Sequence, residues 1–244
     1  MNAILPNGCR MPLWNDLCKI VTTRLKEKSS GNPLTDLSHY SHKRGKSELV
    51  KLLRDHLYVR TAKPGRAHME FAQIPFEHVL TTNFDFLLER AYDAANRPYL
   101  PVVDEDLLPF RPIKGETQLI KMHGDLHHPS LLVMIEDDYD KFPTVREKMF
   151  QAVTHLLVSH SILFIGYSLD DPDFRQIWKF VENKFKLHHP AYALLVGATE
   201  RKIDQYKMRG VTTVVSLPEN QMGYGASLAN EFRAISRALK VGAR

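Results

Sequence analysis

Three short groups of residues in this sequence combine side chains able to do chemistry, and each group directly follows a short apolar run. The groups are Asn83-Phe84-Asp85, His123-Gly124-Asp125 and Gly166-Tyr167-Ser168. They supply an amide, carboxylates, a hydroxyl and an imidazole, which titrates near neutral pH as a general base should. The glycines would let the backbone approach a ligand closely. If the apolar runs are neighbouring strands, we expect the three groups to line one edge of a sheet.

Each group also has an ordinary structural explanation when it is taken alone. An Asn after a strand is often a turn former or a helix cap. A His before a Gly is often a loop residue, and Gly-Tyr-Ser is often a strand-to-helix turn. The presence of all three groups at predicted strand ends favours a functional site.

The elements that must position these groups are a helical first third and then strands that alternate with helices. Apolar runs predict strands at 78–82, 118–122, 131–135, 161–165, 191–196 and 211–217. Helical spacing predicts helices at 12–28, 47–59, 84–96, 140–158, 171–185, 200–208 and 226–239. Such alternation is typical of an α/β fold, with a mostly parallel sheet and helices on both faces. Ligands bind beyond the carboxyl ends of the strands in such sheets.

The composition is that of an ordinary globular protein. Of 244 residues, 43% are hydrophobic and 25% are charged, which excludes a disordered or fibrous chain. We interpret 1–244 as a single domain with a helical portion at about 12–75. The net charge of +5 is too small to imply nucleic acid, so we expect no direct nucleic-acid binding. No apolar run approaches ~20 residues and the N-terminus is unlike a signal peptide, so we expect no membrane contact and a cytoplasmic location.

Metal sites are not expected from the residue pattern. The two cysteines, Cys9 and Cys18, exclude a disulfide framework and a four-cysteine zinc site. His127-His128 and His188-His189 are adjacent pairs, and adjacent side chains rarely point at one ion. The acidic run at 136–140 is interpreted as charge at a helix N-terminus rather than as a magnesium site.

Five segments resemble the motifs of the sirtuin-like domain family, in particular its prokaryotic branch without a zinc module. They are Pro12-Leu13-Trp14-Asn15-Asp16-Leu17, Thr81-Thr82-Asn83-Phe84-Asp85, Lys121-Met122-His123-Gly124-Asp125-Leu126, Glu136-Asp137-Asp138-Tyr139 and Ile165-Gly166-Tyr167-Ser168-Leu169. Their order and spacing are similar to the family over nearly the whole chain. The resemblance implies a Rossmann-like sheet with a helical insert and NAD as the ligand.

The resemblance also implies roles for single residues. Asn83 would hold the nicotinamide ribose and position a water, and His123 would be the general base near the ribose hydroxyls. Asp85 would contact the carboxamide, while Gly166 and Ser168 would contact the phosphates or the adenosine ribose. The loops that bind NAD would also include the adjacent residues Phe84, Gly124 and Tyr167.

Two departures from the family pattern refine this expectation. The missing zinc ribbon favours plain NAD hydrolysis over protein deacylation, and relatives of this kind are often antiviral effectors that deplete NAD. Such effectors act as homo-oligomers or with a partner defence protein. The family's glycine-rich phosphate loop, which precedes the segment resembling Pro12–Leu17, is absent. We therefore expect the chain to be N-terminally incomplete, and the alternative, a degenerate and inactive member of the family, stays open.

We therefore expect a sirtuin-like NAD hydrolase that uses NAD as its substrate, holds no zinc and releases nicotinamide and ADP-ribose. Two alternatives stay open at this point. One is a module that binds NAD or ADP-ribose without cleavage, as a sensor or scaffold. The other is an NAD-dependent protein deacylase.

Overall fold

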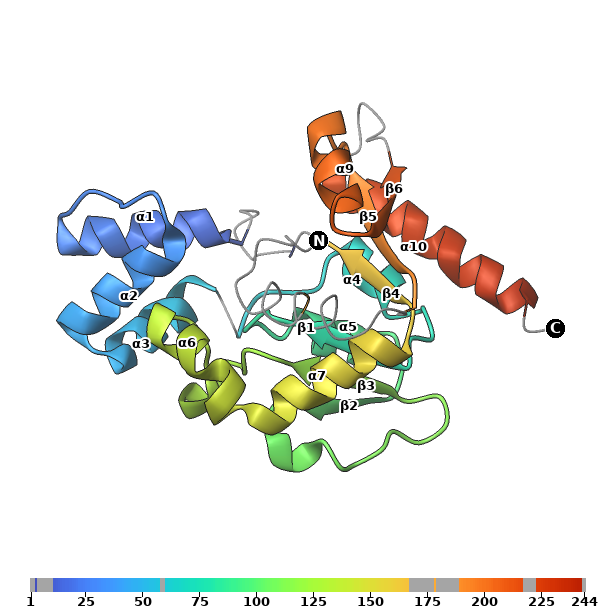
Figure 1. Ribbon diagram of the computed structural model, residues 1–244, viewed down its shortest axis with the longest axis horizontal. Coiled ribbons are helices and arrows are strands. Elements are labelled where there is room, and N and C mark those ends of the chain that lie inside the picture. The colour runs from blue at the N-terminus through green and yellow to red at the C-terminus, as the bar shows by residue number, and fades with distance from the viewer. Residues whose placement is uncertain are drawn as a thin grey trace.

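The protein is a mixed α/β structure built from two parallel sheets and a layer of helices (Figure 1). The structure, a computed structural model, describes residues 3, 11–57, 60–166, 178, 189–216 and 223–242. The predicted helix at 171–185 therefore lies outside the described residues, apart from Trp178. The predicted α/β class is confirmed, since every strand pair among these residues is parallel and helices separate most of the strands.

The first sheet contains β1 (His78–Thr81), β3 (Thr117–Lys121) and β2 (Tyr99–Val102), in the order β1-β3-β2. All five positions of the central strand β3 are buried, as expected for a strand covered on both faces. The sequence-based assignment missed β2. Pro101 argues against a strand, but β2 is an edge strand, where proline is tolerated.

The second sheet contains β4 (Ile162–Ile165), β5 (Ala191–Val196) and β6 (Val211–Ser216), in the order β4-β5-β6. All three polar groups would line one edge only if their strands were neighbours, and β4 does not meet this condition because it pairs with β5. Ile165 of β4 still packs into the same apolar cluster as Val79 of β1. The two sheets thus meet through side chains rather than through a shared ladder of hydrogen bonds.

Helices cover both faces of the first sheet. Leu119 and Ile120 are consecutive in β3 and must point to opposite faces. Leu119 packs with Phe71 of α4 (Arg66–Phe71), with Tyr92 of α5 (Leu87–Ala94) and with the last helix α10 (Gly223–Gly242). Ile120 packs with Met149 of α7 (Glu147–Ser159).

A separate helical layer consists of α1 (Trp14–Leu25), α2 (Pro33–Arg44) and α3 (Lys46–His56), with α6 (Glu136–Val145) beside it (Figure 1). Its apolar cluster, which includes Leu37 and Leu53, also takes in Phe84 and Leu126. The helical layer therefore packs on the loops that follow β1 and β3. The remaining elements are α9 (Glu200–Lys207) and the 3-10 turns Glu105–Leu107 and Pro129–Leu131.

Three local predictions were wrong. The apolar run at 131–135 is no strand: it follows the 3-10 turn, and Asp138 Oδ2 accepts the backbone N–H groups of Met134 and Ile135. The helix predicted at 140–158 is two helices that meet at Arg146. The helix α2 was missed, although Asn32 caps it by accepting the Leu34 N–H at 3.0 Å and Pro33 opens it.

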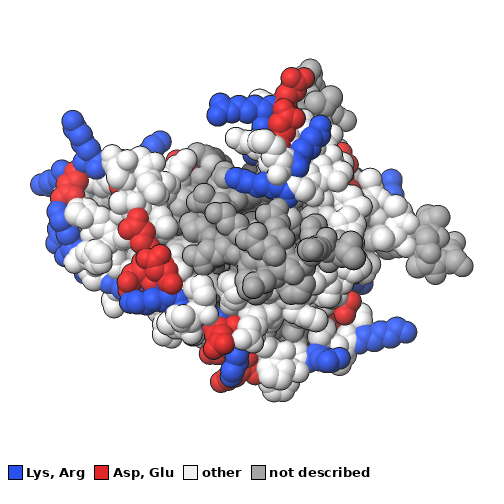
Figure 2. Space-filling view, in the orientation of Figure 1, with Lys and Arg blue, Asp and Glu red and all other residues white. Residues whose placement is uncertain are grey.

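Charged side chains of both signs lie next to each other over the helical layer and over α6 (Figure 2). The acidic run sits in the first turn of α6, as predicted, where Lys46 Nζ lies 2.6 Å from Asp138 Oδ1 and Lys141 Nζ 2.5 Å from Asp137 Oδ2. Among the described residues, no helix has the length and apolar character needed to cross a bilayer.

Candidate active site

The ends of β1 and β3 place two of the three polar groups at one edge of the first sheet. Thr81 is paired with Lys121, and the ladder continues one step further because the Met122 N–H donates to the Thr81 carbonyl at 3.0 Å. The loops after these two strands begin side by side for that reason. The structure thus brings the Asn83 and His123 groups together, as the motif analysis expected.

His123 is held in an aromatic enclosure. Its side chain is only 1% exposed, and its ring centroid lies 5.2 Å from Tyr139, 6.3 Å from Phe142 and 6.5 Å from Phe84. The carbonyl of His123 accepts the Val133 N–H at 3.1 Å, which fixes the backbone beside the ring. The His123 ring is therefore packed among three aromatic side chains and is shielded from solvent.

The loop after β1 presents Asn83 to solvent and buries Phe84. Asn83 is exposed, and its N–H donates to the Thr81 hydroxyl at 3.1 Å. Phe84 is 7% exposed and its ring lies 6.1 Å from that of Trp14 in α1. The helical layer therefore anchors the loop through Phe84 and leaves the Asn83 amide available to a ligand.

Asp85 links this loop to the start of α5. Its Oδ1 accepts the Leu87 N–H at 2.9 Å, where the helix has an unpaired donor. Burial raises the pKa of the Asp85 carboxyl above its usual value, opposed by the Leu87 N–H and then by Lys121. Asp85 is thus engaged in the fold through its Oδ1.

A buried ion pair, Lys121 with Glu89, holds this edge of the sheet and was not identified as functional from the sequence. Lys121 is 1% exposed; its Nζ lies 2.6 Å from Glu89 Oε1 and 2.5 Å from the Asp85 carbonyl, and 4.5 Å from the Phe86 ring centroid. Burial raises the pKa of Glu89, and Lys121 opposes that rise. A lysine inside the apolar run at 118–122 is the signal that points to such a buried partner.

The loop after β3 depends on Gly124 and Asp125. Gly124 has φ +71°, and a Cβ there would lie 2.6 Å from the Leu131 carbonyl oxygen. Asp125 is 3% exposed, and its Oδ1 accepts the backbone N–H groups of His127 at 2.8 Å and His128 at 3.1 Å. Gly124 is thus required because the backbone at Leu131 leaves no room for a side chain. Asp125 stabilises the turn by accepting hydrogen bonds from its backbone N–H groups.

The third group lies at the end of β4 in the second sheet. Gly166 is exposed with φ +60°, which suits a turn out of the strand. Tyr167 and Ser168 lie outside the described residues, so their predicted contacts with NAD stay predictions.

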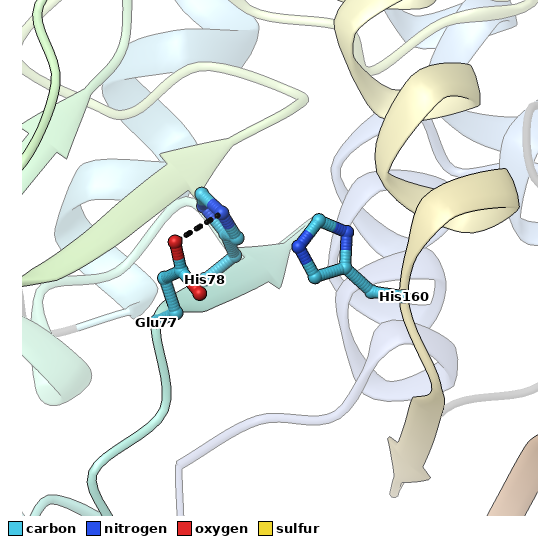
Figure 3. A group of neighbouring side chains, drawn as sticks. All are labelled: Glu77, His78 and His160. Atoms are coloured by element: carbon cyan, nitrogen blue, oxygen red, sulfur yellow. Dashed lines mark ion pairs between the residues drawn. The ribbon is translucent and has the colours of Figure 1, made fainter.

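A cavity of about 250 Å³ lies away from this edge, at the amino ends of β1 and β3. It is lined by residues that include Phe76, Glu77, Arg97, Lys114 and Glu116. Near it, Glu77, His78 and His160 bring three possible metal ligands together (Figure 3). No signal in the local sequence joins these residues, because His160 is far from the other two along the chain.

Comparison with known proteins agrees with the motifs. A model of the SIR2-like domain family matches residues 77–214, which hold every predicted site residue. The chain is 31% identical over 138 residues to an NAD(+) hydrolase ThsA from Bacillus cereus (strain MSX-D12), covering 57% of this chain and 29% of that protein.

Two further relatives extend the comparison. An NAD(+) hydrolase ThsA from Cytobacillus dafuensis is 30% identical over 167 residues, covering 67% of this chain and 33% of that protein. Defense-associated sirtuin 2 from Bacillus subtilis is 28% identical over 122 residues, covering 47% of this chain and 12% of that protein.

The chain spans at most about a third of the length of these three relatives. The family model covers more than half of the chain and includes both strand ends at the candidate site. The family predicted from the motifs is confirmed: this chain belongs to the SIR2-like domain family.

Proposed function

We propose that this chain is a sirtuin-like NAD hydrolase domain that cleaves NAD to nicotinamide and ADP-ribose as part of a defence response. The observation that carries the proposal is the position of His123 and of the Asn83–Asp85 loop, which follow neighbouring parallel strands at one edge of the sheet. The names of the relatives, NAD(+) hydrolase ThsA and Defense-associated sirtuin 2, support the reaction and its setting.

The reaction needs few groups from the protein. The bond between the nicotinamide nitrogen and ribose C1′ breaks, and its electron pair leaves with nicotinamide. Water adds through its oxygen to C1′ and loses a proton, so the products are nicotinamide, ADP-ribose and a proton. Positioning of the water and acceptance of its proton are the two tasks for side chains.

The residues of the site divide these tasks. We assign Asn83 to the nicotinamide ribose and the attacking water, because its amide is exposed at the loop. His123 accepts the proton, and general-base catalysis of this kind contributes about 10²–10⁴-fold to a rate. Asp85 contacts the carboxamide, while Phe84, Gly124, Gly166, Tyr167 and Ser168 complete the contacts with NAD.

The test is nicotinamide release from NAD by the purified chain, measured by chromatography. We expect Asn83→Ala and His123→Ala to abolish release, and His155→Ala, an exposed histidine of α7, to leave it unchanged. Because His123 is buried, circular dichroism must show that its variant is folded. Turnover retained in both folded variants would contradict the catalytic assignment.

One observation favours a second candidate function, a module that binds NAD or ADP-ribose without cleaving it. The aromatic enclosure leaves His123 1% exposed, so a bound ligand need not reach the base. This function predicts saturable binding of ADP-ribose by calorimetry with no nicotinamide release. Release that depends on His123 would exclude it.

The setting is also a proposal. We place the domain in the cytoplasm, where NAD is available, and expect it to act as a homo-oligomer or with a partner defence protein. Light scattering of the purified chain measures the oligomeric state directly.

A further inference from the structure

Three side chains at the amino end of β1 form a cluster of possible metal ligands. Glu77 and His78 stand at the start of β1, and His160 follows the end of α7, just before β4. One ligand atom from each lies within 4.8 Å of the other two, and His78 Nε2 is 3.6 Å from Glu77 Oε1. Figure 3 shows the His160 ring turning one nitrogen toward His78. We propose that Glu77, His78 and His160 bind a divalent transition metal ion of the zinc class.

The hydrogen bonds of His78 leave its Nε2 free to coordinate a metal. Its Nδ1 lies 3.0 Å from Gln118 Oε1, and the orientation of that amide is fixed because Gln118 Nε2 donates to the Phe110 carbonyl at 3.3 Å. An amide oxygen only accepts, so His78 carries its proton on Nδ1. The neutral ring then presents the lone pair of Nε2 toward Glu77.

The hydrogen bonds of His160 lead to the same tautomer. The hydroxyl of Ser159 donates its one proton to the His155 carbonyl at 2.7 Å. Its oxygen lies 2.8 Å from His160 Nδ1, so it accepts a proton from that nitrogen. His160 therefore also presents a lone pair on Nε2. Both rings have the outer partner that metal-binding histidines usually have, which orients the ring.

The donor set and the spacing select the metal. Two imidazoles and one carboxylate suit zinc and its neighbours, whereas magnesium and calcium prefer all-oxygen sites. Zinc–ligand bonds of about 2.0–2.1 Å at tetrahedral angles separate the ligands by about 3.3 Å. The Glu77–His78 separation of 3.6 Å is close to that value, and the exposed Glu77 can rotate to adjust the rest. Water would take the fourth position.

The site differs in place and consequence from the candidate active site. His78 begins β1 and His160 precedes β4, so one ion would join the first sheet to the second at their amino ends. The Asn83 and His123 groups lie beyond the carboxyl ends of the first sheet. The four-cysteine zinc ribbon excluded by the sequence is a different site, and bound metal here would stabilise the pairing of the sheets.

The test is a calorimetric titration of the chain, purified without a histidine tag and dialysed against EDTA. We expect zinc chloride to bind with a stoichiometry of one per chain and to raise the thermal midpoint, since a ligand of the native state stabilises it. Magnesium chloride should produce neither effect. The His160→Ala variant should lose the site, while the matched control His155→Ala, in the helix that precedes His160, should keep it.

A second variant separates metal binding from a purely structural role. Ser159→Ala removes the acceptor that orients His160 and should weaken zinc affinity by about 10–100-fold without removing any ligand. Glu77→Gln changes only an exposed side chain, so it stays folded and should also weaken binding. Equal zinc affinity in wild type, Glu77→Gln and His160→Ala would overturn the proposal, as would equal binding of magnesium. If His160→Ala does not fold, Glu77→Gln and Ser159→Ala decide the outcome.

Discussion

The strongest test of how this sheet edge is built is the replacement of Lys121 by methionine. The change keeps the length of the side chain but leaves Glu89 as a buried carboxylate without its cation and the Asp85 carbonyl without its donor. Breaking a buried pair by removing one partner costs about 3–5 kcal/mol, because an uncompensated charge stays in the interior. We expect Lys121→Met to lower the free energy of unfolding by that amount.

The assay is urea unfolding followed by circular dichroism, with Lys141→Met as the matched control. The Lys141–Asp137 pair is exposed to solvent, so its loss should leave the free energy of unfolding almost unchanged. Adding Glu89→Met to Lys121→Met should recover at least about 1 kcal/mol, because the unpaired charge is gone. In the single variant the pKa of Glu89 rises further, so the cost should be smaller at pH 5 than at pH 8. A cost no larger than that of Lys141→Met, or a double variant no more stable than the single one, would refute this reasoning.

Two further predictions concern single residues. Gly124→Ala must accept φ +71° and a Cβ 2.6 Å from the Leu131 carbonyl, so it should cost about 3 kcal/mol in urea unfolding. Gly31→Ala, which has φ +83° and meets no described atom within 4 Å, should cost only about 1 kcal/mol, and equal costs would show that the close approach is unimportant. Burial lowers the pKa of the His68 imidazole from 6.5 to about 4. Between these two pH values His68 binds a proton in the unfolded state but not in the folded state, so the free energy of unfolding falls as the pH drops from about 6.5 toward 4. The resulting loss of unfolding free energy is at most about 3 kcal/mol, and the His68→Gln variant should lose less over the same pH range. If the unfolding free energies of wild type and His68→Gln fall with equal slopes against pH, burial of His68 is not the cause.

The strands that position the site were predictable because their signals are local. The apolar runs at 78–82 and 118–122 became β1 and β3 within a residue at each end, and the polar groups after them lie where a parallel sheet puts them. The run at 131–135 shows the limit of this signal. This run is as apolar as the two strands and is mostly buried. However, Asp138 accepts hydrogen bonds from two of its backbone N–H groups, and among the described residues no strand pairs with it.

The roles of single polar residues depended more on the tertiary structure. Asp125 and Gly124 look like site residues in the sequence, but their contacts in the structure stabilise the turn after β3: Asp125 accepts two backbone N–H groups, and Gly124 leaves room for the Leu131 carbonyl. Lys121 looks like an ordinary strand residue, yet it is buried against Glu89 and holds the loop after β1. Sequence shows that a charge lies in an apolar run, and only packing shows which group neutralises it.

The sequence by itself determined the family, the α/β class and the pairing of a His group with an Asn group at strand ends, because these follow from short motifs and from local periodicity. Only the tertiary structure decided that β4 belongs to a second sheet, that His123 is enclosed by Tyr139 and Phe142, and that His160 reaches Glu77 and His78. Those arrangements join segments far apart along the chain. These arrangements are stabilised by burial and by contacts between elements that are distant in the sequence. A short stretch of neighbouring residues carries no information on such contacts.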